Sequence, residues 1–240
     1  MRYSPKVAAR KFIKKHFPNA FVAFLGGSAA NRNLTPNSDL DIVVFDDSQF
    51  PFKQNFTGYG WPIEAFVLTR SVYRSFFDEA RRSGLPSMIR MCAEGETIVD
   101  TGFAEEIRSE ARDLMSQGPF EWTWDERNQV RYQITEGLED LSDANSYHEN
   151  LFIVNQLTEL VTNFILRANG QWIGIGKWAV RSLAEYDKAL CDEFLNALDC
   201  FYKKETVELL IPFVDRALEP HGGRLLEGWG EGSSIFNEEE

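Results

Sequence analysis

The chain has 240 residues, 43% of them hydrophobic and 26% charged, which is typical of a globular protein with one large domain or two ordinary ones. Its formal net charge of −12 disfavours a long polynucleotide substrate, because nucleic-acid-binding proteins normally carry a basic surface. A cationic small molecule or a protein partner suits this charge better. No apolar run approaches the roughly 20 residues that a membrane span needs. The three cysteines are scattered and form no CxxC pair, which favours a reducing compartment and predicts a cytoplasmic location.

The first half of the chain is expected to alternate helices and strands. The basic N-terminus predicts an amphipathic helix, because Val7, Ala8, Phe12 and Ile13 share one helical face. A further helix is expected to begin at Ser71, whose hydroxyl could cap it. Strands are expected over residues 21–25, 40–45, 63–68 and 97–100, and the later helices over 71–82 and 104–115.

A Gln-Gly-Pro linker at 117–119 separates this part from a second half with helical periodicity almost throughout. Asn169 and Gly170 suit the C-cap of one of these helices. We therefore expect an α+β fold, in which a small mixed sheet flanked by helices (1–117) is followed by a helical bundle (118–240). The expected helices of the second half span residues 125–145, 149–168, 177–190, 192–201 and 205–218.

Residues 26–46, GGSAANRNLTPNSDLDIVVFD, carry the clearest chemical signal. Asp39 and Asp41 stand two residues apart on a strand, so their carboxylates point to the same side and repel each other unless a cation lies between them. Mg²⁺ suits this pair, because it usually takes one or two carboxylates together with phosphate oxygens and water. The turn at Gly27 and Ser28 lets backbone N–H groups approach a phosphate closely.

A third carboxylate strengthens this interpretation. Glu64 interrupts the otherwise apolar stretch WPIEAFVLT. If the strand of Glu64 pairs beside residues 40–45, its carboxylate can complete a three-carboxylate site. A buried glutamate without a partner or a metal is unfavourable.

The order and spacing of these residues resemble those of the nucleotidyltransferase superfamily of DNA polymerase β. Gly27, Ser28, Asp39, Asp41 and Glu64 match its Gly-Ser turn, Asp-x-Asp strand and later acidic residue. Residues 171–187, QWIGIGKWAVRSLAEYD, more loosely resemble small bacterial aminoglycoside and lincosamide adenylyltransferases with a helical C-terminal domain. The first part of the chain would then be the nucleotidyltransferase catalytic domain.

The resemblance implies that a nucleoside triphosphate, expected to be ATP, binds over Gly27 and Ser28 and that Asp39 and Asp41 hold Mg²⁺. A nucleoside monophosphate would pass to a hydroxyl of a small acceptor, such as an aminoglycoside-like antibiotic. Glu64 would either bind a second metal ion or act as general base. Other candidates for the base lie in the helical half, where Lys177 could also reach the triphosphate. These other candidate bases are Glu136, Glu139 and Asp140.

Two other functions stay open from sequence. One is a protein that adenylylates a partner protein or neutralises a toxin by binding it, as small members of this superfamily do. The other is a nucleotide-binding module that has lost its chemistry, against which the intact carboxylates argue. Neither a nucleic acid nor a membrane is expected as a partner, and the sequence does not decide between a monomer and a homodimer.

Overall fold

The structure is a computed structural model that describes residues 2–30, 35–143, 146–227 and 229–230. It divides into two compact units, Met1–Pro119 and Phe120–Glu240. The division falls two residues beyond the boundary expected from the sequence. Gly118 lies just before it, at the C-cap of the preceding helix, where its N–H donates to the Leu114 carbonyl oxygen at 3.1 Å.

The first unit is built on a five-stranded sheet in the order β3-β4-β2-β1-β5. Strands β2 and β4 run parallel, whereas the other neighbouring pairs are antiparallel. The sheet is therefore mixed, and with the helical second unit it confirms the predicted fold class. Its strands are β1 (Val22–Leu25), β2 (Leu40–Phe45), β3 (Phe52–Gly58), β4 (Trp61–Leu68) and β5 (Glu96–Asp100).

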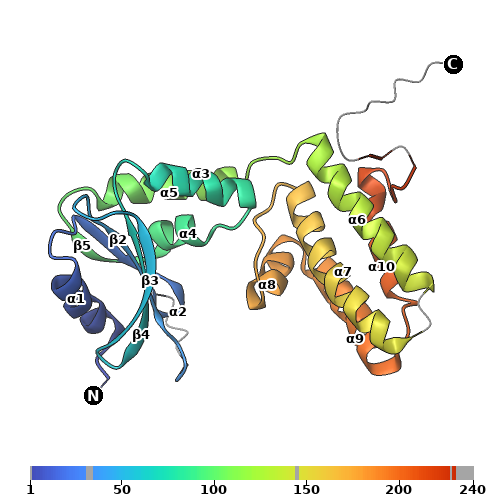
Figure 1. Ribbon diagram of the computed structural model, residues 1–240, viewed down its shortest axis with the longest axis horizontal. Helices are drawn as coiled ribbons and strands as arrows, with labels where there is room; N and C mark the ends of the chain where they lie inside the picture. The colour runs from blue at the N-terminus through green and yellow to red at the C-terminus, as the bar shows by residue number, and fades with distance from the viewer. Residues whose placement is uncertain (1, 31–34, 144–145, 228, 231–240) are drawn as a thin grey trace, which may run out of the picture. The chain divides into compact units, whose positions relative to one another are not determined.

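Helix α1 (Pro5–His16) covers one face of this sheet (Figure 1). The predicted apolar stripe of this helix is confirmed except at Val7, which is 40% exposed, while Ala9 takes a buried place instead. The helix packs on the side chains of β2 and β4 that alternate toward it. These buried strand residues are Leu40, Ile42, Val44, Ile63, Ala65 and Val67.

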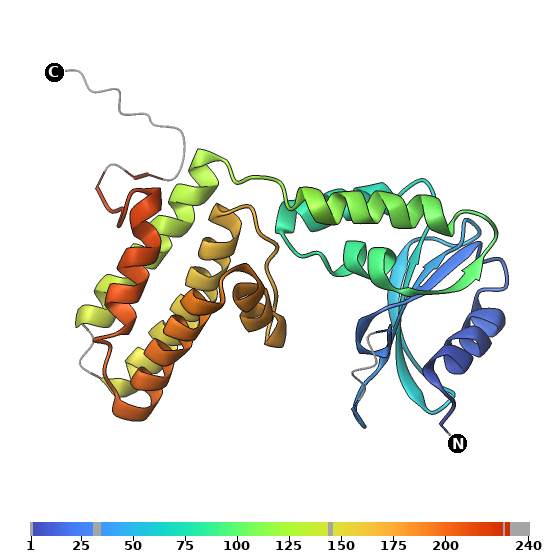
Figure 2. The ribbon, with the colours of Figure 1, turned by 180° about the vertical axis from the view of Figure 1, so that it is seen from behind.

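Helices α3 (Tyr73–Ser83), α4 (Ser87–Glu94) and α5 (Ala104–Gln117) lie on the other face (Figures 1 and 2). Aromatic edge-to-face contacts join this layer to the sheet, since the Phe45 ring lies 5.7 Å from that of Tyr73. The predicted cap at Ser71 is wrong. The helix begins at Tyr73 with Val72 as N-cap, because the Ser71 hydroxyl is hydrogen-bonded to Thr69 at 2.9 Å.

The second unit is helical, and its core consists of apolar side chains from every α-helix that the structure describes in it. One predicted helix, 177–190, is broken at Asp187, whose carboxylate caps the next helix by accepting from the Leu190 N–H at 3.0 Å. The helix predicted over 205–218 begins at Leu210 instead. Glu205 adopts φ 56° and ends the preceding helix. The helices are α6 (Trp124–Asp143), α7 (Tyr147–Ala168), α8 (Lys177–Tyr186), α9 (Lys188–Lys204), α10 (Leu210–Leu218) and the short 3-10 turn η1 (Glu219–His221).

The segment after η1 is hydrogen-bonded to α6. Arg131 is 8% exposed, and its guanidinium donates to the Gly223 carbonyl oxygen from both Nε and Nη2. The Leu225 N–H donates to Thr135 Oγ1 at 2.9 Å. Within the described parts of the chain, none of the helices has the length and apolar character needed to cross a membrane.

Candidate functional site

The Gly-Gly turn after β1 lies directly against the start of β2. The Gly26 N–H donates to the Asp41 carbonyl oxygen at 2.8 Å. Gly27 has φ +60°, and a Cβ atom built on it would lie 1.9 Å from Asp41 Oδ2. Residue 27 therefore has to be glycine for two reasons, its left-handed backbone and the carboxylate that occupies the place of its side chain. The structure thus brings together the turn and one of the two aspartates.

The two aspartates lie at the start of strand β2. Asp39 directly precedes β2 and is exposed, whereas Asp41 is the second residue of β2 and is half-buried. A turn before them is closed by the Thr35 N–H, which donates to Ser38 Oγ at 2.8 Å. Gly27 begins the four-residue helix α2 (Gly27–Ala30). The predicted role of the Ser28 side chain lies outside the described part of the structure.

Glu64 lies beside Asp41 in the parallel register of β2 and β4. The sequence left the pairing of these two strands as a condition, and the structure meets it. The sequence did not predict the direction of the Glu64 side chain, whose Oε1 atom is paired with Lys53 Nζ of β3 at 2.7 Å. The exposed fractions are 25% for the Glu64 side chain and 58% for that of Lys53. The carboxylate is therefore partly desolvated and matched by an ammonium group.

The site offers oxygen donors that suit Mg²⁺. Among the described residues, no three His, Cys, Asp or Glu side chains lie close enough together to hold a metal ion. The structure thus does not gather Asp39, Asp41 and Glu64 into one three-ligand group. A Mg²⁺ ion that also binds substrate phosphates and water needs only one or two carboxylates, and Asp39 and Asp41 fit this requirement. The contact with Gly27 fixes the second of them.

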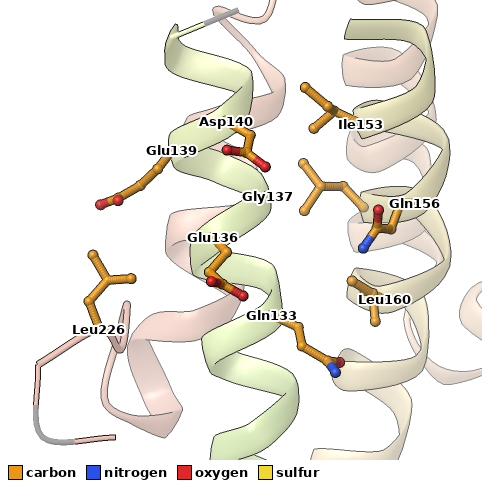
Figure 3. A pocket seen from close by; sticks show the side chains of 10 residues that line it. Gln133, Glu136, Gly137, Glu139, Asp140, Ile153, Gln156, Leu160 and Leu226 are labelled. Atoms are coloured by element: carbon orange, nitrogen blue, oxygen red, sulfur yellow. The ribbon is translucent and has the colours of Figure 1, made fainter. Parts of the chain in front are cut away.

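The remaining candidates belong to the second unit. Glu136, Glu139 and Asp140 are exposed residues of α6 that line a cavity of about 560 Å³ (Figure 3). Glu136 accepts a hydrogen bond from the Tyr132 hydroxyl at 2.6 Å. In Figure 3, Glu139 points away from α7, on the side of Leu226. The full lining is Gln133, Glu136, Gly137, Glu139, Asp140, Ile153, Gln156, Leu157, Leu160 and Leu226.

Lys177 is the first residue of α8 and is exposed. It follows Gly176, which adopts a positive φ of 57°. The assignment of Lys177 and of the acidic residues on α6 to the same site as Asp41 stays a prediction.

Lys53 is the site residue that the sequence did not indicate. It belongs to FKQNFTG, an exposed stretch whose polar residues follow no clear alternation. One signal could have located it. In an antiparallel pair, a long side chain two positions from the residue opposite Glu64 can reach it diagonally.

Comparisons with known proteins find similarity among solved structures. No protein-family model and no curated protein sequence matches the chain. Among solved structures, the chain is similar to a nucleotidyltransferase-like protein from Exiguobacterium sibiricum 255-15, with 11% sequence identity and a TM-score of 0.48. The match covers 90% of this chain and 74% of the other. A likeness of this size carries no argument about activity, so function has to follow from the chemistry of the site.

Proposed function

We propose that the chain is a Mg²⁺-dependent nucleotidyltransferase that transfers a nucleoside monophosphate, AMP from ATP, to a hydroxyl of a small molecule. The observation that carries the proposal is the contact between Gly27 and Asp41. It joins a turn suited to phosphates and a strand that carries an Asp-x-Asp pair, which are the two parts that metal-assisted nucleotidyl transfer requires.

The residues of the turn and of the strand then have separate roles in the reaction. The backbone amides of the turn at Gly27 and Ser28 bind phosphate oxygens, because glycine leaves the backbone accessible. Asp39 and Asp41 would hold the metal ion through their carboxylate oxygens. When bound, Mg²⁺ would supply positive charge to the triphosphate and its leaving group. The acceptor oxygen forms a bond to the α-phosphorus, the bond to the bridging oxygen breaks, pyrophosphate leaves, and the acceptor proton passes to a base.

A cationic acceptor is supported by charge. The net charge of −12 favours a positively charged ligand over an anionic one. Glu136, Glu139 and Asp140 add three carboxylates around the cavity of the second unit, a lining that suits amines and hydroxyls. We therefore place an aminoglycoside-like polyamine first among acceptors.

The test is the release of pyrophosphate from ATP and Mg²⁺ across a panel of aminoglycosides and lincosamides, with Asp41→Ala as the blank. Acceptor-dependent release that disappears in the variant would establish the reaction and the acceptor class together. Release that persists undiminished in Asp41→Ala would remove the proposed site. Binding of ATP and Mg²⁺ without release for any acceptor would exclude these small molecules and favour a protein acceptor or an inactive module.

A further inference from the structure

The face of the sheet opposite α1 is only partly covered along β4. Along β4 (Trp61–Leu68), Ile63, Ala65 and Val67 are buried on the face that carries α1. Glu64 and Phe66 alternate with them and are only half-buried, so they lie on the opposite face. That face continues into β2, because Asp41 stands beside Glu64 in the register. Glu64 thus lies on the same face as Asp41, and 25% of its side chain is exposed.

Lys53 joins this surface from the edge strand. In the antiparallel register of β3 and β4, Lys53 lies opposite Phe66 and is the diagonal neighbour of Glu64. Its ammonium nitrogen is 2.7 Å from Glu64 Oε1 and 5.0 Å from the centre of the Phe66 ring. The ion pair and the ring both fix the lysine above the face that carries Glu64.

The side chains of the two neighbouring acids are held in opposite directions. Asp41 Oδ2 lies against Gly27, which follows β1, and Glu64 Oε1 lies against Lys53 on β3. In the strand order β3-β4-β2-β1-β5, these two contacts are on opposite sides of the β4–β2 pair. The separation agrees with the lack of a three-ligand group among the described His, Cys, Asp and Glu side chains.

We propose that Lys53 is a positioning residue, which holds Glu64 out of the metal site and keeps it available as the base for the acceptor. This inference rests on the proposed function. Among the protein carboxylates, Asp39 and Asp41 alone would then hold Mg²⁺. Glu64 takes the proton of the acceptor hydroxyl while the acceptor oxygen bonds to the α-phosphorus and pyrophosphate leaves with the electron pair of the broken bond. Lys53 contacts neither reactant and acts through Glu64.

Two measurements on the full chain test this assignment. The first is the Mg²⁺ concentration that half-saturates binding of α,β-methylene ATP, followed by calorimetry. The second is kcat for pyrophosphate release with the acceptor that the panel identifies. The variants are Glu64→Gln, Lys53→Met and Lys53→Arg, with Asp41→Asn as the metal-ligand reference. Lys14→Met, at an exposed position of α1, is the matched control for removing a lysine.

We expect Glu64→Gln to lower kcat by about 100-fold or more, because a general base contributes on this scale. Its half-saturating Mg²⁺ concentration should stay within about twofold of wild type, whereas that of Asp41→Asn should rise by at least about tenfold. Lys53→Met should lower kcat by about tenfold without changing Mg²⁺ affinity, because Glu64 loses its fixed position. Lys53→Arg should restore most of the rate, since it keeps the cation.

If Glu64 binds the metal instead, the variants should change Mg²⁺ affinity. If Glu64 were a metal ligand, Lys53 would compete with the ion. Lys53→Met would then tighten Mg²⁺ binding, and Glu64→Gln would weaken it as much as Asp41→Asn does. Either result would overturn the role of Lys53 while leaving the proposed function intact. A wild-type protein that binds no nucleotide in the presence of Mg²⁺ would instead refute the proposed function itself.

Discussion

The contact between Gly27 and Asp41 makes Gly27→Ala an informative substitution. A Cβ at residue 27 would lie 1.9 Å from Asp41 Oδ2 and 2.9 Å from its Cγ, so the carboxylate has to move. The backbone φ of +60° costs alanine about 1–2 kcal/mol, and a strained aspartate rotamer costs about 0.5–1.5 kcal/mol. Together the variant should lose roughly 1.5–3.5 kcal/mol of unfolding free energy, measured by urea denaturation. It should also lose Mg²⁺-dependent nucleotide binding, by at least about tenfold.

Gly170→Ala is the matched control for the backbone. Gly170 has a similar φ of +67°, and a Cβ built on it meets nothing within 4 Å. This variant should therefore lose only the backbone share, about 1–2 kcal/mol, and bind nucleotide as the wild type does. Calorimetry with α,β-methylene ATP compares the two variants directly. Wild-type Mg²⁺ and nucleotide affinity in Gly27→Ala would show that the position of the Asp41 carboxylate does not matter, and would refute the reasoning.

The remaining predictions concern other positions. Asp39→Ala should abolish pyrophosphate release without lowering the unfolding free energy, because it removes one of two repelling carboxylates; a urea transition at much lower concentration would contradict this. Ser28→Ala should weaken nucleotide affinity only mildly in calorimetry, since the backbone N–H groups remain. Hydrogen bonds from the Ala104 amide and the two amides before it hold the pKa of Asp100 below its ordinary value. Its stabilisation is therefore present above pH about 4 and lost as the pH falls through the lowered pKa. Asp100→Ala should cost about 1 kcal/mol at pH 7, a difference that shrinks in urea titrations below pH about 4. Arg131→Met leaves a carbonyl of the C-terminal segment unpaired and should cost about 1–3 kcal/mol in the same assay, with faster proteolysis of that segment.

Elements with strong local signals could be predicted from the sequence. Strand β2 (Leu40–Phe45) has the expected bounds, because its apolar run is bounded by acids at both ends. Helix α7 ends at Ala168, and Gly170 follows in the left-handed region, as the Asn-Gly pair predicts. In both cases a short segment determines its own limits.

Strand β3 (Phe52–Gly58) could not be predicted in this way. It is the exposed edge of the sheet, where hydrogen bonding to β4 replaces hydrophobic burial as the cause of the strand. The same lack of a signal concealed Lys53. Helix α4 (Ser87–Glu94) was also not predicted from its eight residues, and it forms because Ile89 and Cys92 are buried.

In the candidate site, too, some features could be predicted from local sequence and others depend on distant residues. The spacing of the Gly-Ser turn and the two aspartates follows the sequence, and the adjacency of Glu64 and Asp41 needs only a parallel pairing of their strands. The directions of the carboxylates depend on partners from elsewhere in the chain, Gly27 for one and Lys53 for the other. Such long-range partners have no pattern in a single sequence.

The most direct test of the central claim is calorimetric binding of α,β-methylene ATP to the wild-type protein and to Asp41→Ala, with and without Mg²⁺. The wild type should bind the nucleotide much more tightly when Mg²⁺ is present, because Asp39 and Asp41 would hold the ion against the phosphates. Asp41→Ala should lose this dependence on the metal while it unfolds at the same urea concentration or a higher one. Equal Mg²⁺-dependent affinity in the two proteins would contradict the assignment of the site.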